Sequence, residues 1–303
     1  MTVLVHFIVM LGMFVVIPLG ISLVEGRGSG GMARLRRWWP LAAAAGTAAL
    51  WLPRGPLAVG CAAGYAVATL ALALQAPRRL ARTRSLAASE VAVLTALATP
   101  AVAGAALVAE RGGYRLFGFD LDILALTVPH FHFAGFAAAL IAGLVCRGTG
   151  GGRAGRAAAL SVPVGTLLVL AGYFADDWAE LAGALVLTAG MWLVGLLTWR
   201  DLRTTGPDRT TRALLACSAT VLVATMLLAL SWALGEATGL PHPSLAWMAA
   251  THGLGNALGF ALCALLAQRR LRAVQVPAPD EPVAQTHGTT TEPDIRTLKE
   301  RTA

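Results

Sequence analysis

The chain has 303 residues, of which 56% are hydrophobic and only 13% are charged. This composition and a mean hydropathy of +0.67 exclude a soluble globule, because too few polar side chains are available to cover its surface. The formal net charge of +8 does not indicate a nucleic-acid partner, since the basic residues fall between apolar blocks and act as topology signals. We therefore predict an all-α, polytopic integral membrane bundle.

Nine apolar segments are candidates for transmembrane helices, because a hydrocarbon core of about 30 Å requires roughly 20 apolar residues in helical form. In chain order they lie near Val3–Val24, Trp38–Leu52, Pro56–Gln75, Val91–Val108, Ile123–Cys146, Ala157–Phe174, Trp178–Trp199, Ala213–Gly235 and Leu245–Ala267. The second segment is short. It should nevertheless cross, because the loops before Trp38 and after Gln75 are both rich in arginine and are expected on the same side of the membrane.

Basic residues are distributed unevenly between the two alternating sets of loops. Eighteen of the twenty-four fall in one set, which comprises loops 25–37, 76–88, 147–156 and 200–212 and the stretch 268–272. The alternate loops hold three, Arg54, Arg111 and Arg115, and the last three lie near the C-terminus. Because cytoplasmic loops carry the excess of arginine and lysine, this pattern predicts an N-terminus outside and a C-terminus in the cytoplasm.

The chain is expected to contain one transmembrane helical domain, residues 1–271, and a disordered cytoplasmic tail, residues 272–303. The tail is rich in Pro, Thr, Asp, Glu and Gln and has no apolar periodicity. The first apolar segment is followed by arginines and not by a small-residue cleavage site, so we expect it to remain as a span. The abundance of alanine and arginine fits a GC-rich bacterial genome, and we predict the bacterial cell (cytoplasmic) membrane as the location.

Three histidines lie within predicted spans. His130 and His132 belong to the sequence TVPHFHFAGF in the fifth span, and His252 belongs to THGLGNALGF in the ninth. Counted from the outer end at 1.5 Å per residue, all three lie about 10–15 Å deep. Intramembrane ionisable residues mark pathways or sites by default, so we infer a functional role for these three. His6 and His242, which are close to water, are expected to be structural.

Helix geometry limits how the three histidines can meet. Residues i and i+2 point in nearly opposite directions on an α-helix, so His130 and His132 cannot serve one site unless the helix is distorted. Pro129 removes a backbone donor and predicts a kink or a widened turn. His252 and Asn256 share one face. We therefore expect one fifth-span histidine to face His252, with Asn256 beside it, in a substrate or proton site.

Acidic residues lie at the outer ends of the spans and not within them. Asp122 precedes the fifth span, and Asp176 and Asp177 form a tight turn between the sixth and seventh. These three are predicted to form an outer rim above the histidines. Aspartates in such turns are more often solvated cap residues than ligands.

The four cysteines, Cys61, Cys146, Cys217 and Cys263, are scattered singly without CxxC or CxxCH spacing, which removes thiolate metal sites and covalently attached haem. HExxH, GxSxG and P-loop motifs are missing as well, so no zinc protease, serine hydrolase or ATP-driven pump is indicated. The spacings Gly60–Gly64 and Gly255–Gly259 match GxxxG and predict close helix packing.

Two motifs together resemble the YndJ-like family of bacterial membrane proteins: LTVPHFHFAGF and WMAATHGLGNALGF. The matching positions are Thr127, His130, Phe131, His132, Ala134, Gly135, Phe136, Trp247, His252, Gly253, Asn256, Gly259 and Phe260. The resemblance implies a multi-pass helical membrane protein of a family that is sometimes labelled as transporters, and it brings little further biochemistry. Pro129 departs from the non-proline residue expected in relatives, so the local geometry there can differ.

Three functions fit these observations. The first is transport of a small solute, in which the histidines bind or relay protons and no cofactor is needed. The second is a redox or metal enzyme, in which His130, His132 and His252 bind haem, copper or zinc. The third is a membrane scaffold. We favour transport over an enzyme, with the lipid bilayer and a small solute as partners and no nucleic acid; the sequence does not fix the oligomeric state.

The predicted topology leads to a labelling experiment. Single cysteines placed at Arg54, Gly112 and Leu240 should react with an impermeant thiol reagent added from outside, whereas those at Ser29, Arg82 and Thr205 should not. Labelling at Arg82 from outside would overturn the orientation.

Overall fold

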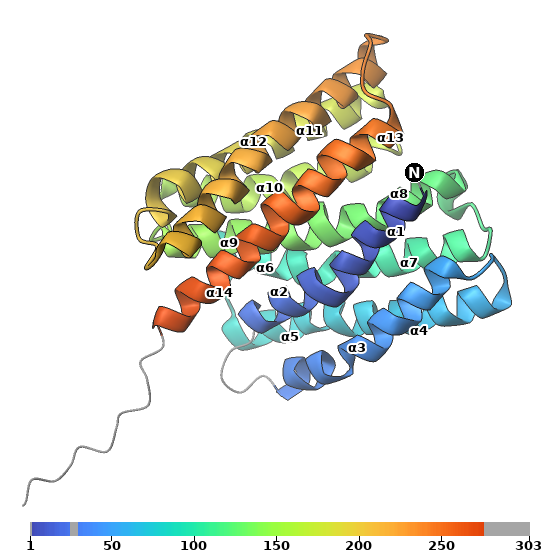
Figure 1. The fold of residues 1–303 in the computed structure, drawn as a ribbon, viewed down its shortest axis with the longest axis horizontal. Helices are drawn as coiled ribbons and strands as arrows, with labels where there is room; N and C mark the ends of the chain where they lie inside the picture. Colours follow the sequence, from blue (N-terminus) through green and yellow to red (C-terminus); the bar gives the residue numbers. More distant parts are fainter. Residues whose placement is uncertain (1, 25–29, 276–303) are drawn as a thin grey trace, which may run out of the picture.

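The computed structural model describes residues 2–24 and 30–275, in which all regular secondary structure is helical. The described helices join end to end into nine longer helical segments, which we call rods. Successive rods are antiparallel (Figure 1). Figure 1 shows the α3–α4 pair on one side of the bundle and α10, α11 and α12 on the other, with the first and last rods between them. The predicted all-helical bundle is therefore confirmed.

The first four rods have the following bounds: α1 (Thr2–Leu11), the π-helical segment η1 (Gly12–Val16) and α2 (Ile17–Val24); α3 (Gly30–Trp51); α4 (Pro56–Ala73) with α5 (Gln75–Thr83); and α6 (Ala88–Ala98) with α7 (Pro100–Arg111). Proline begins both α4 and α7, where its fixed φ and missing N–H suit the first helical position.

The other five rods have these bounds: α8 (Leu121–His130), the π-helical segment η3 (Phe131–Ala137) and α9 (Ala138–Gly148); α10 (Arg153–Gly172); α11 (Asp177–Leu197) with η4 (Thr198–Leu202); α12 (Arg209–Thr238); and α13 (Leu245–Met248), η5 (Ala249–Gly253), η6 (Gly255–Leu262) and α14 (Cys263–Gln275). A short 3₁₀ turn, η2 (Leu116–Gly118), precedes α8. Asp176, Asp208 and Ser244 each cap the following helix by accepting a backbone N–H.

Eight rods are long and apolar enough to cross a membrane, so the protein is a multi-pass membrane protein. The exception is α3, whose 22 residues would span about 33 Å but begin with a basic half that contains Arg34, Arg36 and Arg37. The crossing of α3 therefore stays a prediction. At the other terminus α14 continues to Gln275, and residues 276–303, which make up most of the expected tail, lie outside the described residues.

The two sets of loops lie at opposite ends of the bundle. At one end, Arg79 and Arg147 both bind Glu90, and Arg270 binds Asp208. We call this the arginine-rich end, and we call the opposite end, which holds loops 52–55, 112–120, 173–176 and 239–244, the acidic end. The predicted partition of loops is borne out by the fold, whereas the side of the membrane that each end faces stays a prediction.

All three arginines of the acidic end are held by carboxylates. Glu110, only 1% exposed, accepts hydrogen bonds from Arg54 at 3.0 and 2.8 Å and from the neighbouring guanidinium of Arg111. Arg115 pairs with Asp120. Glu110 is shared by two arginines and Asp120 pairs with the third, so these contacts offset two of the three positive charges.

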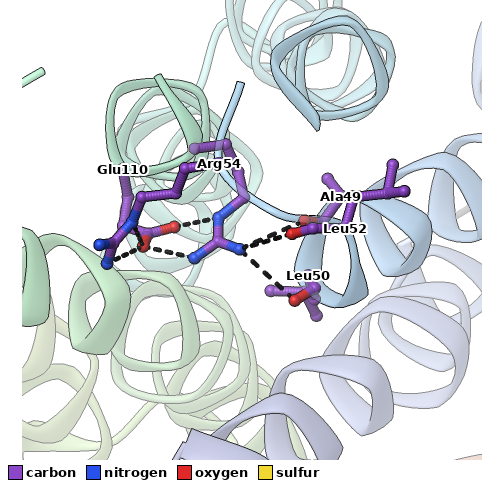
Figure 2. Close-up of polar contacts among 6 residues, drawn as sticks. Ala49, Leu50, Leu52, Arg54 and Glu110 are labelled. Atoms are coloured by element: carbon purple, nitrogen blue, oxygen red, sulfur yellow. Dashed lines mark hydrogen bonds and ion pairs between the residues drawn. The ribbon is translucent and has the colours of Figure 1, made fainter. Parts of the chain in front are cut away.

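The Glu110 cluster also fixes the end of α3 (Figure 2). Nη1 of Arg111 donates to the carbonyl oxygens of Ala49, Leu50 and Leu52, each at 3.4 Å. The last carbonyls of a helix have no intrahelical donor, so the buried guanidinium acts as a C-terminal cap. α3 is thereby tied to α7 at the acidic end.

Glycines allow α10 and α11 to approach at backbone distance. A Cβ on Gly183 would lie 2.5 Å from the backbone nitrogen of Val169, and one on Gly165 would lie 2.5 Å from Cα of Leu187. The predicted Gly255–Gly259 pair also packs closely, with a Cβ on Gly259 meeting Val221 at 2.7 Å. Gly60, in contrast, has nothing within 4 Å, so the Gly60–Gly64 spacing does not mark a tight helix crossing.

Gly183→Ala should destabilise the bundle, because the obstructing atoms are backbone and cannot rotate away. Overpacking of this kind costs about 1–3 kcal/mol, and we expect a lower thermal unfolding midpoint in detergent. Gly60→Ala is the matched control and should leave the midpoint unchanged or slightly higher. Equal midpoints for the two variants would contradict the packing of α10 on α11.

Candidate functional site

Three π-helical segments meet in the middle of the bundle. η1 of the first rod, η3 of the fifth and η6 of the ninth are in mutual contact. η3 begins two residues after Pro129, which confirms the widened turn predicted there. A π-helical turn redirects side chains and frees backbone groups, and such turns are frequent at functional sites. The two sequence motifs with intramembrane histidines coincide with these segments.

His132, in η3, points into the side of the bundle formed by α3 and α4. It is fully buried, its Nε2 lies 2.7 Å from the hydroxyl of Tyr65, and the two rings meet edge to face. A Cβ on Gly12 would lie 2.6 Å from His132 Nδ1, so only glycine permits this approach of the first rod. That Nδ1 atom has no hydrogen-bond partner among the described residues.

A second polar contact lies next to this histidine. Trp39 donates its indole N–H to the carbonyl oxygen of Met13 at 2.8 Å, and its ring meets Tyr65 edge to face. Met13 belongs to η1, where the π-helical turn leaves the carbonyl free to accept an external donor. His132, Tyr65 and Trp39 thus join the first, second, third and fifth rods through buried polar groups.

His252, in η5, makes a different set of contacts. Its Nδ1 lies 2.8 Å from the backbone carbonyl of Thr225, so Nδ1 carries the proton and Nε2 is left to accept. Asn256 Nδ2 is 3.2 Å from that Nε2, and Asn256 Oδ1 accepts from the Thr225 hydroxyl at 2.7 Å. The expected pairing of His252 with Asn256 on one face is therefore present, and α12 supplies the third member.

His130 and His252 line the same cavity. It has a volume of about 230 Å³ and is walled mainly by apolar side chains of the first, fifth, sixth, seventh, eighth and ninth rods. Asn256 also lines it, whereas His132 does not. The structure therefore brings together two of the three histidines predicted to share a site and directs the third to Tyr65, because His130 and His132 leave the fifth rod in different directions.

A second hollow lies at the acidic end above this cavity. It has a volume of about 310 Å³, and its titratable lining residues are Tyr173, Asp176, Asp177, Glu180, Glu236 and His242. Tyr173, Glu180, Trp232 and Leu245 line both spaces, so the hollow adjoins the histidine cavity. We call the outer space the acidic vestibule.

Two of the three predicted rim residues belong to this vestibule. Asp176 and Asp177 line it, and Asp176 also caps α11 through the backbone N–H of Ala179 at 2.8 Å. Asp122 is exposed and is not part of the lining, although its neighbour Ile123 is. The position of Asp122 in the first turn of α8 fits a carboxylate that interacts with the helix dipole.

Glu180 is the residue that sequence reasoning missed. Only 9% of it is exposed, and it lies between the vestibule and the cavity. One feature of the sequence could have indicated Glu180 as a site residue. Glu180 follows Asp176 by four residues, so the two side chains lie on the same face of α11. Burial raises the pKa of Tyr173, and the nearby Glu180 carboxylate adds to this effect. Tyr173 is therefore protonated at neutral pH and can donate its hydrogen bond to Glu180.

The vestibule favours cations. Its lining contains four carboxylates and neither arginine nor lysine, and His242 Nε2 is 3.1 Å from Glu236. Clefts lined by charge of one sign concentrate ions of the opposite sign. Trp232 lines both the vestibule and the inner cavity.

His6 and His242 each contact a tryptophan. His6 meets Trp51 edge to face at 5.1 Å between ring centroids, and His242 meets Trp232 at 6.3 Å. His6 lines neither the cavity nor the vestibule. Among residues 2–24 and 30–275, no group of three His, Cys, Asp or Glu side chains is arranged to hold a metal ion.

Comparisons with known proteins identify the family of the chain. No curated protein and no solved structure matches the chain. A model of the YndJ-like protein family matches residues 7–260. This range extends from the first rod to η6 and includes both histidine motifs and the acidic vestibule. The chain belongs to the YndJ-like protein family.

Proposed function

We propose that this protein transports a small cationic solute across the membrane, between the acidic end and the arginine-rich end, with protons exchanged at Glu180, His130 and His252. One observation carries the proposal, namely the adjacency of the acidic vestibule and the histidine cavity through Tyr173, Glu180, Trp232 and Leu245. An acidic entrance above an apolar space with a few convergent polar groups is the arrangement expected for a ligand pathway.

The dimensions support a small solute. The cavity of about 230 Å³ is below the range of about 300–1,000 Å³ that is usual for drug-sized ligands. Its polar side chains are His130, His252, Asn256, Glu180, Tyr173 and Trp232, and the rest of the wall is apolar. A monovalent organic cation with a small apolar body fits both the charge of the entrance and the chemistry of the wall.

Proton exchange is supported by where the titratable groups lie. Glu180 stands at the boundary of the two spaces, so a cation that passes it competes with a proton for the same carboxylate. Histidine is the side chain whose ordinary pKa is closest to neutrality, which suits uptake and release of protons during a cycle. The lone pair of His252 Nε2 accepts from the Asn256 amide at 3.2 Å, and it could accept the exchanged proton if that hydrogen bond opened.

The path is closed toward the arginine-rich end in this conformation. Beyond the cavity the fifth rod is packed on all sides from Phe136 to Ala142. Release of the solute at the arginine-rich end therefore requires a rearrangement of the helices. The fifth and ninth rods depart from regular helix at the widened turns of η3, η5 and η6, so we expect the rearrangement to occur there.

The alternative of a metal or haem enzyme fits less well. Copper or zinc needs a convergent ligand set, and the described part of the chain offers no group of three suitable side chains. A haem macrocycle is larger than a drug-sized ligand and does not fit a cavity of about 230 Å³. A scaffold function has no observation in its favour beyond the helical bundle itself.

Transport can be tested in proteoliposomes with radiolabelled benzyltrimethylammonium, a small permanent cation, and with pyranine inside the vesicles to record proton movement. We expect faster uptake than in empty vesicles, with protons moving in the opposite direction. Glu180→Gln should reduce uptake by about tenfold or more, because loss of the attraction between a carboxylate and a nearby cation costs at least about 1.4 kcal/mol. His252→Ala should reduce uptake to a similar extent, because it removes an acceptor of the exchanged proton.

Two controls make the outcome decisive. Asp201→Asn removes a carboxylate at the arginine-rich end and should leave uptake unchanged. Benzenesulfonate, an anion of similar size, should not be transported. Uptake no faster than in empty vesicles, or equal uptake of the anion, would contradict the proposal.

A further inference from the structure

A groove at the arginine-rich end lies apart from the proposed transport pathway. It has a volume of about 680 Å³ and is bounded by the first rod, α3 and α14. Figure 1 shows α2 and α14 side by side at this end, with the start of α3 close to α2. None of its lining residues belongs to the histidine cavity or to the acidic vestibule.

The wall of the groove along the first rod is apolar. Phe14 and Pro18 are four residues apart, as are Val15 and Leu19, so each pair forms part of a continuous strip on the rod. Phe14 is 42% exposed, which suits a side chain that faces lipid. From Phe14 to Leu23 the strip extends about 13 Å along the helix axis.

The other wall changes from apolar to basic in two turns of α14. Leu266, Arg269 and Arg272 follow at intervals of three residues and therefore share one face. Arg36 contributes a third guanidinium from α3. The described lining residues include no carboxylate. The groove therefore has an apolar portion and an arginine portion, arranged along the direction in which a lipid lies in a membrane.

One of these arginines also holds the helices together. Nη1 of Arg272 donates to the carbonyl oxygens of Ser22 at 2.8 Å and Leu23 at 3.1 Å, at the end of α2. The guanidinium is thereby fixed at the rim of the groove, with its charge next to the helix end. Arg36 and Arg269 are both exposed at that rim.

We propose that this groove binds one anionic phospholipid of the membrane, with the phosphate at Arg36, Arg269 and Arg272 and an acyl chain along the strip from Phe14 to Leu19. Basic pockets between transmembrane helices bind anionic head groups, and guanidinium groups suit phosphate because they donate two parallel hydrogen bonds. A soluble anion would use the arginines but leave the apolar strip uncovered, so the groove as a whole matches a lipid.

The test uses the full-length protein in detergent and titrates it with dioleoylphosphatidylglycerol or dioleoylphosphatidylcholine, with native mass spectrometry to count bound lipid. We expect one tightly held phosphatidylglycerol and markedly weaker retention of phosphatidylcholine. The double variant Arg36→Gln/Arg269→Gln should weaken phosphatidylglycerol binding by about 30-fold, because each arginine near an anionic lipid contributes about a factor of five. Arg272 is left intact because it caps α2.

A charge-matched control separates the groove from the general basicity of this end. Arg153→Gln/Arg156→Gln removes two exposed arginines at the start of α10 and should leave phosphatidylglycerol binding unchanged. Equal losses in the two double variants, or equal retention of the two lipids by the wild-type protein, would overturn the proposal.

A third variant distinguishes a lipid from a free phosphate compound and does not alter the arginines. Leu266→Trp fills the apolar wall and should weaken phosphatidylglycerol binding while the unfolding midpoint without lipid stays close to wild type. If glycerol phosphate alone raises the unfolding midpoint as much as the lipid does, or if Leu266→Trp binds phosphatidylglycerol as the wild type does, the site is not a lipid site.

Discussion

The arrangement of the bundle depends on the contact between three π-helical segments, each from a different rod. η1, η3 and η6 contact one another in the middle of the bundle, and regular α-helices there could not present the same groups. The widened turn in η1 leaves the Met13 carbonyl for Trp39, and Gly12 lets the first rod approach His132. In lipid every backbone polar group needs an internal partner, so a widened turn persists only where neighbouring rods supply donors and acceptors.

This meeting point gives the two histidines of the fifth rod different environments. His132 is enclosed by Tyr65 and the first rod, and it stabilises the packing of α4 against the centre of the bundle. His130 faces the cavity that it shares with His252. The same motif therefore provides one buried packing group and one group available to a ligand. The acidic vestibule adds Glu180 at the boundary, and the proposed transport function follows from these neighbouring spaces.

Much of this architecture could be predicted from the sequence, because apolar length and the alternation of arginine depend on properties of single segments. The span limits, the two ends of the bundle and the pairing of His252 with Asn256 are of this kind. Which of His130 and His132 shares a cavity with His252 could not be predicted. The answer depends on how the widened turn after Pro129 packs against rods that are distant in the sequence. Glu180 was missed because a carboxylate in the first turn of a helix usually faces water, and only the packing of Gly172 against α11 shows that it is buried.

The central claim is that His130 and His252 share a space open to small cations and that His132 does not. The most direct test measures how fast single cysteines react with 2-aminoethyl methanethiosulfonate, a small cationic thiol reagent. The cysteines are introduced one at a time after the four native cysteines have been replaced. We expect His130→Cys and His252→Cys to react and His132→Cys to stay unmodified in the folded protein. Modification of His132→Cys as fast as the other two, or no reaction at either cavity position, would contradict it.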